Sequence, residues 1–148
     1  MIERTCVIIK PDGVGKKIVG KAISYLEEHN LKLLALKMVR PAKEEIENFY
    51  SVHKGKPFFE PFIRFMTSGP IIVSVWEGEN CISLVRQIIG NTDSRLAAKG
   101  TLRNLYGTDG RKNLVHASDS LENAQQEIDL FFAPEEILKY DENAWRQS

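Results

Sequence analysis

Residues 113–120 read Asn-Leu-Val-His-Ala-Ser-Asp-Ser, and this stretch decides how the second half of the chain is built. Its first four residues predict a short apolar strand over 113–116. Asp119 belongs to the residue types that helices favour at the N-cap, and Glu122 follows it at the spacing of a capping box. The stretch therefore predicts a strand that ends in His116 and is followed at once by a helix.

The rest of the chain alternates between strand and helix patterns in the same way. Apolar, β-compatible runs predict strands over 4–10, 31–40 and 71–76. Apolar residues at helical spacing predict helices through Ile18–Leu26, Ile46–His53, Phe59–Met66, Ile82–Ile89 and Leu121–Phe131. The segment 91–112 has little periodicity and is predicted to be a long loop. This order indicates one α/β sandwich in which helices cover a small sheet.

The composition bounds the class of protein. Of 148 residues, 43% are hydrophobic and 27% are charged, which suits one folded domain and excludes a disordered chain. Basic and acidic residues number 20 each, so a general nucleic-acid binder is not expected. No apolar run approaches the roughly 20 residues of a membrane helix. The start of the chain lacks the pattern of a signal peptide, and Cys6 and Cys81 lack metal-type spacing, so we expect a cytoplasmic protein.

The charge is distributed unevenly along the chain. Residues 86–116 contain six basic and two acidic residues, whereas 117–148 contain eight acidic and two basic ones. The first segment is suited to binding anions. Two solvated faces of opposite sign would give the same pattern, so charge alone leaves both interpretations open.

His116 is the first candidate for chemistry. It lies between a strand and a helix N-terminus, where free amide hydrogens and the helix dipole favour phosphate groups. Glu127 falls at the edge of the apolar stripe of that helix, so we expect it to be half-buried and to need a partner. With Ser118 nearby, a histidine held by a carboxylate and a hydroxyl would be an oriented nucleophile or base. The alternatives are a core histidine and a surface salt bridge.

Lys10 is the second candidate. It ends the first strand, and the carboxyl ends of strands in α/β folds are common ligand sites. A solvated lysine at a strand end is the alternative. The nearby Gly13-Val14-Gly15-Lys16 is not a P-loop, because that motif needs glycine at position 10 and Ser or Thr at position 17. Any phosphate chemistry would therefore use side chains and a histidine.

Other residues have a simpler interpretation when each is taken alone. Tyr50 and Phe58 are aromatic residues near the two central helices, where core packing accounts for them. Arg86 and Arg103 bracket the predicted loop and would be surface charges. His53, like His29, has no oriented partner in the sequence and is assigned no role.

Taken together, these residues resemble the nucleoside diphosphate kinase family. The stretch 113–120 is accompanied by Lys10-Pro11-Asp12-Gly13-Val14, Lys56-Pro57-Phe58-Phe59, Thr67-Ser68-Gly69-Pro70, Trp76-Glu77-Gly78, and Gly100-Thr101 with Arg103. Their order and spacing match that family from about Glu3 to Pro134. One such block would be weak, whereas several in register over nearly the whole chain are specific.

The resemblance implies a fold and a reaction. The fold would be a ferredoxin-like βαββαβ sandwich of the α+β kind, a four-stranded antiparallel sheet covered by helices, in one domain over 1–148 whose tail is 134–148. The reaction would transfer the γ-phosphate of ATP or another nucleoside triphosphate to nucleoside and deoxynucleoside diphosphates. His116 would be phosphorylated on the way, in a ping-pong scheme. Mg²⁺ would arrive on the nucleotide phosphates, with few or no protein ligands.

The resemblance also implies roles for single residues. Ser118 and Glu127 would orient the imidazole, and Phe58 would stack on the base. The phosphate and sugar positions of the family correspond to Lys10, Tyr50, Arg86, Thr92, Arg103 and Asn113, of which Lys10 and Tyr50 also belong to the catalytic group. Stacking on an aromatic face tolerates base identity, so we expect broad use of purine and pyrimidine nucleotides.

Several positions depart from the pattern of the family. Ala117 replaces the usual glycine after the histidine, where a methyl group would crowd the imidazole, or restrict the backbone if φ is positive. Ser94 and Lys99 stand where prolines are common, in a loop that family members use between subunits. Phe62 is bulkier, and Gly110 smaller, than usual. The resemblance implies a homo-oligomer, either a hexamer or a tetramer.

Two other classes of function remain open at this point. A nucleotide-binding sensor of the same fold would have lost turnover, with Ala117 as its sign. A protein-interaction module would act through the acidic tail and Trp145. Binding alone does not need an oriented His116, so this residue favours an enzyme.

Overall fold

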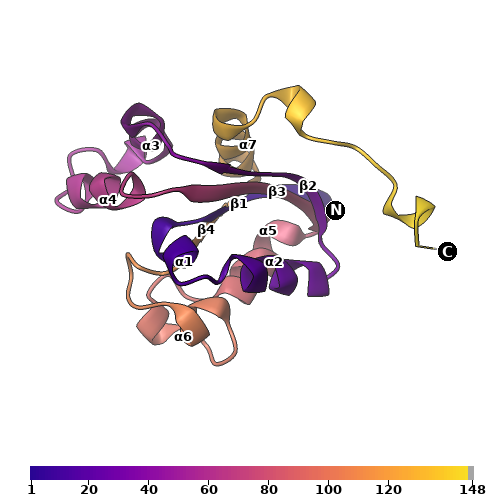
Figure 1. Ribbon diagram of the computed structural model, residues 1–148, viewed down its shortest axis with the longest axis horizontal. Helices are drawn as coiled ribbons and strands as arrows, with labels where there is room; N and C mark the ends of the chain where they lie inside the picture. The colour runs from indigo at the N-terminus through magenta and orange to yellow at the C-terminus, as the bar shows by residue number, and fades with distance from the viewer. Residues whose placement is uncertain (147–148) are drawn as a thin grey trace.

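The computed structural model describes residues 1–146 and contains a four-stranded sheet in the order β2-β3-β1-β4 (Figure 1). The strands are β1 (Ile2–Ile9), β2 (Lys32–Val39), β3 (Ile71–Glu79) and β4 (Val115–Ala117). All neighbouring strands are antiparallel. Helices connect β1 to β2 and β3 to β4, so the predicted βαββαβ sandwich with an antiparallel sheet is confirmed.

Helices cover both faces of this sheet. They are α1 (Pro11–Gly15), α2 (Val19–Glu28), α3 (Lys43–Phe49), α4 (Phe59–Met66), α5 (Cys81–Ile89), α6 (Leu102–Tyr106) and α7 (Leu121–Phe131). Short 3₁₀ helices are η1 (Ser51–His53), η2 (Ser94–Leu96), η3 (Pro134–Glu136) and η4 (Glu142–Ala144). In Figure 1, α3, α4 and α7 lie on one side of the sheet, and α1, α2, α5 and α6 lie on the other.

Strand β1 contributes to two apolar cores, one on each face. Val7 and Ile9 pack with α2 and α5, whereas Cys6 and Ile8 pack with α3, α4 and α7. Burial on both faces explains why the strand is a continuous apolar run in the sequence. Ile8 is paired directly with His116, so both side chains point to the face that α3, α4 and α7 cover.

Two short helices were not predicted. One is α1, which begins at Pro11 directly after the first strand, because proline fits the first turn of a helix. The predicted loop 91–112 contains η2 and α6, and the Thr101 side chain caps α6 by accepting from the amide of Asn104. A five-residue helix makes little more than one turn, too short for a periodic apolar stripe.

The elements around the histidine start later than predicted. The strand expected over 113–116 begins two residues later, because Leu114 has a φ of +76°, outside the extended region. Helix α7 is capped by Ser120, whose hydroxyl accepts from the amide of Asn123. The prediction that Asp119 is the N-cap was therefore wrong, and its carboxylate accepts instead from the side-chain amide of Asn123.

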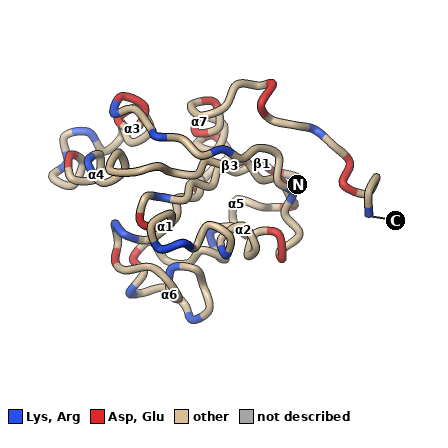
Figure 2. Tube along the Cα trace, viewed as in Figure 1, with Lys and Arg blue, Asp and Glu red and all other residues tan. Residues whose placement is uncertain are grey.

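The C-terminal tail leaves the body of the molecule along β2. The amide of Leu138 donates to the carbonyl of Leu34 at 3.1 Å, and the Tyr140 hydroxyl donates to the carbonyl of Leu33. Figure 2 shows the acidic residues of this tail well apart from the basic residues around α6. The predicted tail 134–148 ends in residues 147–148, which lie outside the described residues. Within the described part, no helix has the length and apolar character needed to cross a membrane.

Candidate active site

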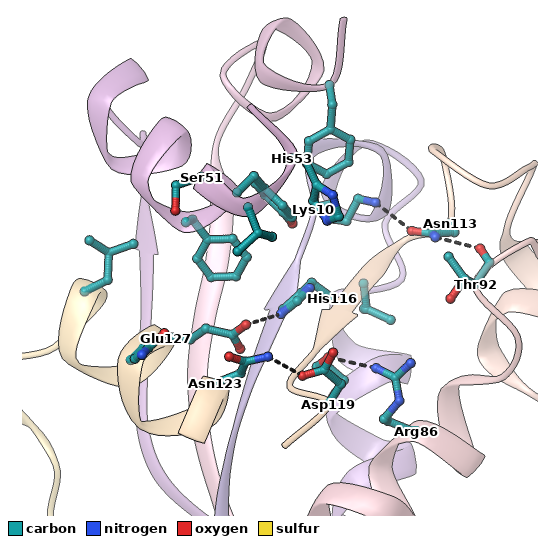
Figure 3. A pocket seen from close by; sticks show the side chains of 18 of the residues that line it. Lys10, Ser51, His53, Arg86, Thr92, Asn113, His116, Asp119, Asn123 and Glu127 are labelled. Carbon is teal, nitrogen blue, oxygen red and sulfur yellow. Dashed lines mark hydrogen bonds and ion pairs between the residues drawn. The ribbon is translucent and has the colours of Figure 1, made fainter. Parts of the chain in front are cut away.

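The predicted site residues converge on a cavity of about 390 Å³ (Figure 3). Its walls include residues of α3, η1, α4, α5, α6, β4 and α7 and the residue that follows β1. Eight of the ten predicted residues line it, namely Lys10, Tyr50, Arg86, Thr92, Arg103, Asn113, His116 and Glu127. Ser118 is buried behind the lining. Phe58 lies outside the lining and is 46% exposed.

His116 is held from one side by a chain of hydrogen bonds. Glu127 Oε2 lies 3.0 Å from Nε2 of His116, and Glu127 Oε1 accepts from the Ser118 hydroxyl at 2.6 Å. The Ser118 oxygen in turn accepts from the amide of Cys6 at 3.1 Å, which ties it to β1. Because a carboxylate only accepts, Nε2 carries the ring proton, and the lone pair of the neutral imidazole lies on Nδ1.

Aromatic rings pack edge-on against the imidazole. The ring centroids of Phe49 and Tyr50 lie 4.8 Å and 6.2 Å from that of His116. Burial, together with the negative charge of Glu127, raises the pKa of the Tyr50 hydroxyl well above its usual value. Tyr50 is therefore a neutral hydrogen-bond donor beside the imidazole at physiological pH.

Lys10 lines the cavity and is almost completely buried. Its Nζ donates to Asn113 Oδ1 at 2.6 Å (Figure 3) and to the carbonyl of Arg111 at 2.8 Å. Burial lowers its pKa to about 8, although the nearby charge of Asp12 opposes that change. The ammonium also lies 5.2 Å from the ring centroid of Phe62. The sequence alternative of a solvated lysine is excluded by this burial.

Arg103 is buried as well, although the sequence alone suggested a surface charge. Its Nε, Nη1 and Nη2 donate to the carbonyl oxygens of Asn113, Gly90 and Val115, at 3.2, 2.9 and 2.6 Å. Burial, with a smaller effect of the positive Arg86, lowers its pKa to about 10. A guanidinium has five N–H groups, so two remain for a ligand in the cavity.

Arg86 and Thr92 complete the cationic end of the cavity. Arg86 Nη1 donates to the carbonyl of Ala117 at 3.1 Å, which positions the guanidinium beside the strand that bears His116. The carbonyl of Thr92 accepts from Asn113 Nδ2 at 2.7 Å. Three cationic side chains, a hydroxyl and an amide therefore face one end of the cavity, a set that suits a polyphosphate.

Some lining residues were given no role in the site from the sequence. His53, which was assigned no role, lines the cavity together with Phe62. The His53 ring lies 5.3 Å from the ring of Phe58, and the Phe62 ring lies 4.4 Å from that of Tyr50. His53 follows Tyr50 by three residues, the spacing of one helical face, so that spacing could have identified it.

Ala117 does not strain the backbone. It lies in β4, opposite Val7, and it is not one of the described residues with positive φ. Its methyl group is buried in the core formed with α2 and α5, on the opposite face of the strand from His116. Neither of the concerns raised by the absence of glycine at this position therefore applies.

The cavity also contains a carboxylate besides that of Glu127. Asp119 lines it, with Oδ1 accepting from the side-chain amide of Asn123 at 2.6 Å. Among residues 1–146, no group of three or more His, Cys, Asp and Glu side chains is arranged to hold a metal ion.

The sequence of the chain matches one known protein family. A family model described as nucleoside diphosphate kinase matches residues 3–137. The nucleoside diphosphate kinase of Staphylothermus marinus is 52% identical over 138 residues, which are 93% of this chain and 98% of that relative. The one from Persephonella marina is 48% identical over 138 residues, 93% of this chain and 99% of the relative.

Solved structures agree with these sequence relatives. Nucleoside diphosphate kinase from Aquifex aeolicus superposes with a TM-score of 0.90 at 44% identity, over 93% of this chain and all of that one. The enzyme from Halobacterium salinarum, in complex with CDP, gives a TM-score of 0.93 at 40% identity, over 97% of this chain and 96% of that one. The similarity therefore extends over nearly the whole chain in both sequence and fold.

Proposed function

The chain belongs to the nucleoside diphosphate kinase family, and we propose that it passes the phosphoryl group through a covalent phosphohistidine on His116. The enzyme is a phosphotransferase that moves the γ-phosphate of a nucleoside triphosphate to a nucleoside diphosphate. Relatives with about 50% sequence identity are named for this activity, so a sensor without turnover is not favoured. The interaction module is not favoured for the same reason.

The observation that carries the proposal is the hydrogen bond between His116 and Glu127. It leaves the lone pair on Nδ1, and within residues 1–146 this atom makes no hydrogen bond. In the first half-reaction, Nδ1 forms a bond to the γ-phosphorus while the bond to the β–γ bridging oxygen breaks, and the diphosphate leaves with that electron pair. The ring becomes positively charged, and the negative carboxylate of Glu127 stabilises that positive charge.

The cationic end of the cavity supports the transfer step. In phosphoryl transfer the negative charge spreads over the oxygens of the moving group, so fixed donors around it lower the barrier. Lys10, Arg86, Arg103, Thr92 and Asn113 supply these donors in the proposed scheme. A second diphosphate would occupy the same end and take the group back from Nδ1, which gives ping-pong kinetics.

We assign the base of the nucleotide to the aromatic rim of the cavity. Phe58 is half exposed beside His53, and its ring face lies under the ammonium of Lys56 at 5.8 Å. An aromatic face contacts any base through its π-surface, so purine and pyrimidine nucleotides should both be accepted. The halophilic relative was solved with CDP, a pyrimidine nucleotide, which supports this assignment.

Mg²⁺ is assigned to the nucleotide and treated as part of the substrate. This ion keeps several waters and is held by one or two carboxylates together with substrate phosphates. Asp119, at the edge of the cationic end, could contribute one such oxygen, and the other polar groups there are donors suited to phosphate. The residues present therefore fit an ion that enters with its nucleotide.

Assembly and compartment are also proposed. We assign a homo-oligomer, a hexamer or a tetramer, supported by the exposed apolar side chains of Leu36 and Met38 on the edge strand β2. Sedimentation would test it, and a monomer at all concentrations would exclude it. A cytoplasmic location is supported by Cys6 and Cys81, which are both free thiols.

A labelling experiment tests the phosphohistidine. The protein is mixed with γ-labelled ATP and Mg²⁺ and then chased with a nucleoside diphosphate. We expect an acid-labile, alkali-stable label that the diphosphate removes. His116→Ala should abolish labelling, whereas His29→Ala, at the exposed end of α2, should retain it. Labelling that persists in His116→Ala would identify another nucleophile and overturn the proposal.

A further inference from the structure

Leu114, two residues before His116, has a backbone conformation that leucine avoids. Its φ is +76°, and the amide of Val115 donates to the carbonyl of Asn113 at 2.9 Å, which together define a rare γ-turn centred on Leu114. Such strain persists only where the surroundings impose it, and it often marks a functional site. The other described non-glycine residues with positive φ are polar ones beside helix ends, namely Lys17, Asn30 and Asn80.

The segment after β1 holds both peptide groups of Leu114. The amide of Leu114 donates to Oδ2 of Asp12 at 3.0 Å, and its carbonyl accepts from the amide of Lys10 at 2.8 Å. Gly13 leaves room for this approach, because a Cβ there would lie 2.8 Å from the Leu114 oxygen. The Leu114 side chain is fully buried in the core. The turn is therefore fixed by three neighbours and its own side chain.

The turn joins two parts of the active site. Asn113, the first residue of the turn, accepts from Nζ of Lys10 at 2.6 Å, and His116 directly follows Val115, the last residue of the turn. Lys10 belongs to the same segment as Asp12, although it is far from His116 in the sequence. The hydrogen bonds of Leu114 with Asp12 and Lys10, together with the pairing of β1 and β4, therefore link the segment that carries the cation to the strand that carries the imidazole.

We propose that Asp12 is a positioning residue for phosphoryl transfer, because its hydrogen bond to the amide of Leu114 maintains the γ-turn that sets His116 relative to Lys10. This inference rests on the proposed role of His116. Loss of the bond would let Leu114 relax to negative φ and shift the start of β4. A misplacement of about 1 Å at a reacting group can cost roughly 100-fold in rate.

A different explanation would give Asp12 only an electrostatic role, through its charge near Lys10. Asp12→Asn separates the two, because asparagine keeps an oxygen that accepts from Leu114 but removes the charge. Its amide group would take the place of Oδ1, a buried atom without a hydrogen-bond partner among the described residues. Asp12→Ala removes both the acceptor and the charge.

The first experiment compares these two variants. The rate of phosphoenzyme formation from ATP is measured in single turnover, and the Kd for ADP is measured separately. We expect Asp12→Asn within about threefold of the parent and Asp12→Ala slower by about tenfold or more, with similar Kd values. Equal losses in both variants would show that the charge matters instead, and no loss in Asp12→Ala would also overturn the proposal.

The second experiment asks whether Asp12 acts through the conformation of Leu114. Leu114→Gly and Leu114→Ala both remove the buried side chain, but only glycine adopts positive φ without strain. Asp12→Ala should therefore slow phosphoenzyme formation several-fold less in the Leu114→Gly background than in the Leu114→Ala background. Equal effects in the two backgrounds would overturn the proposal.

If the variant Asp12→Ala is too unstable for kinetics, the same comparison between the two backgrounds can be made by measuring melting temperatures. The loss of melting temperature caused by Asp12→Ala should be smaller in the Leu114→Gly background. Each comparison is made within one background, so the greater chain entropy of glycine cancels. His116→Ala tests the phosphohistidine independently, so a failure of that proposal is distinguishable from a failure of this one. Equal losses of melting temperature would contradict the role of Asp12.

Discussion

Glu127 Oε2 lies 3.0 Å from Nε2 of His116, and this contact ties helix α7 to strand β4 across the active-site cavity. The contact fixes the proton on Nε2 and so leaves Nδ1 free to react. In the proposed reaction, it also places a negative charge beside the ring that becomes positive on phosphorylation. One hydrogen bond can thus orient the nucleophile before the reaction and stabilise charge during it.

Substitution of Glu127 by glutamine separates these two effects. Glu127→Gln keeps an oxygen that accepts from Nε2 but removes the charge. We expect kcat to fall by about 10- to 100-fold, the worth of a charged hydrogen bond, with an unchanged Kd for nucleotides. Ser118→Ala leaves the carboxylate charged and should cost less. Steady-state kinetics measure both, and parental kcat in Glu127→Gln would contradict the electrostatic role.

Lys10 predicts how nucleotide capture depends on pH. Burial lowers its pKa to about 8, and a lysine is charged below its pKa, so a rise of pH through about 8 removes a positive charge from the phosphate end. We expect kcat/KM to fall over this range as the ammonium of Lys10 loses its proton. Bound phosphates favour the charged ammonium, so kcat itself should fall only at higher pH.

The control for this prediction is Lys10→Arg, because arginine stays charged over the range. Its kcat/KM should be lower at neutral pH, since guanidinium fits the contact with Asn113 differently, but it should lack the decline near pH 8. A pH profile of kcat/KM for both proteins makes the comparison. A decline that persists unchanged in Lys10→Arg would assign it to another group.

Phe58 predicts how the enzyme treats different bases. Phe58→Ala should raise KM by about tenfold for purine and pyrimidine diphosphates alike, since stacking on an aromatic ring contributes roughly 1–3 kcal/mol whatever the base. The ring is half exposed, so the melting temperature should change little. Leu138→Ala is the control, because Leu138 is an apolar residue of the tail that is also exposed. A change in KM confined to one base would be inconsistent with stacking.

The sheet could be predicted because its strands are apolar on both faces, so each strand is visible in the sequence without knowledge of its neighbours. Strand β3 nevertheless extends beyond Trp76 to Glu79, because pairing with β1 also orders Glu77, Gly78 and Glu79, which have no apolar side chain. Helices α1 and α6 could not be predicted. They are held by a proline at the first turn and by the cap of Thr101, which are local contacts without a periodic signature.

The active site was predicted unevenly, for a physical reason. His116, Ser118 and Glu127 lie close in sequence on a strand and the next helix, so their proximity follows from local structure. Arg103 looked like a surface charge, yet it is 7% exposed, because its partners are carbonyl groups whose positions only the complete fold determines. The positive φ of Leu114 could not be predicted for the same reason, since its hydrogen-bond partner Asp12 comes from the other end of the chain.

Arg103 recognises peptide oxygens and not side chains. An oxygen of this kind is present whichever amino acid occupies positions 90, 113 and 115, so this arginine alone sets no limit on mutation there. Apart from Thr92 and Arg103 itself, which line the cavity, the segment between its anchoring points can therefore diverge in composition while its two ends stay in place. During evolution, such a loop is free to acquire new surface properties without disturbing the chemistry beside it.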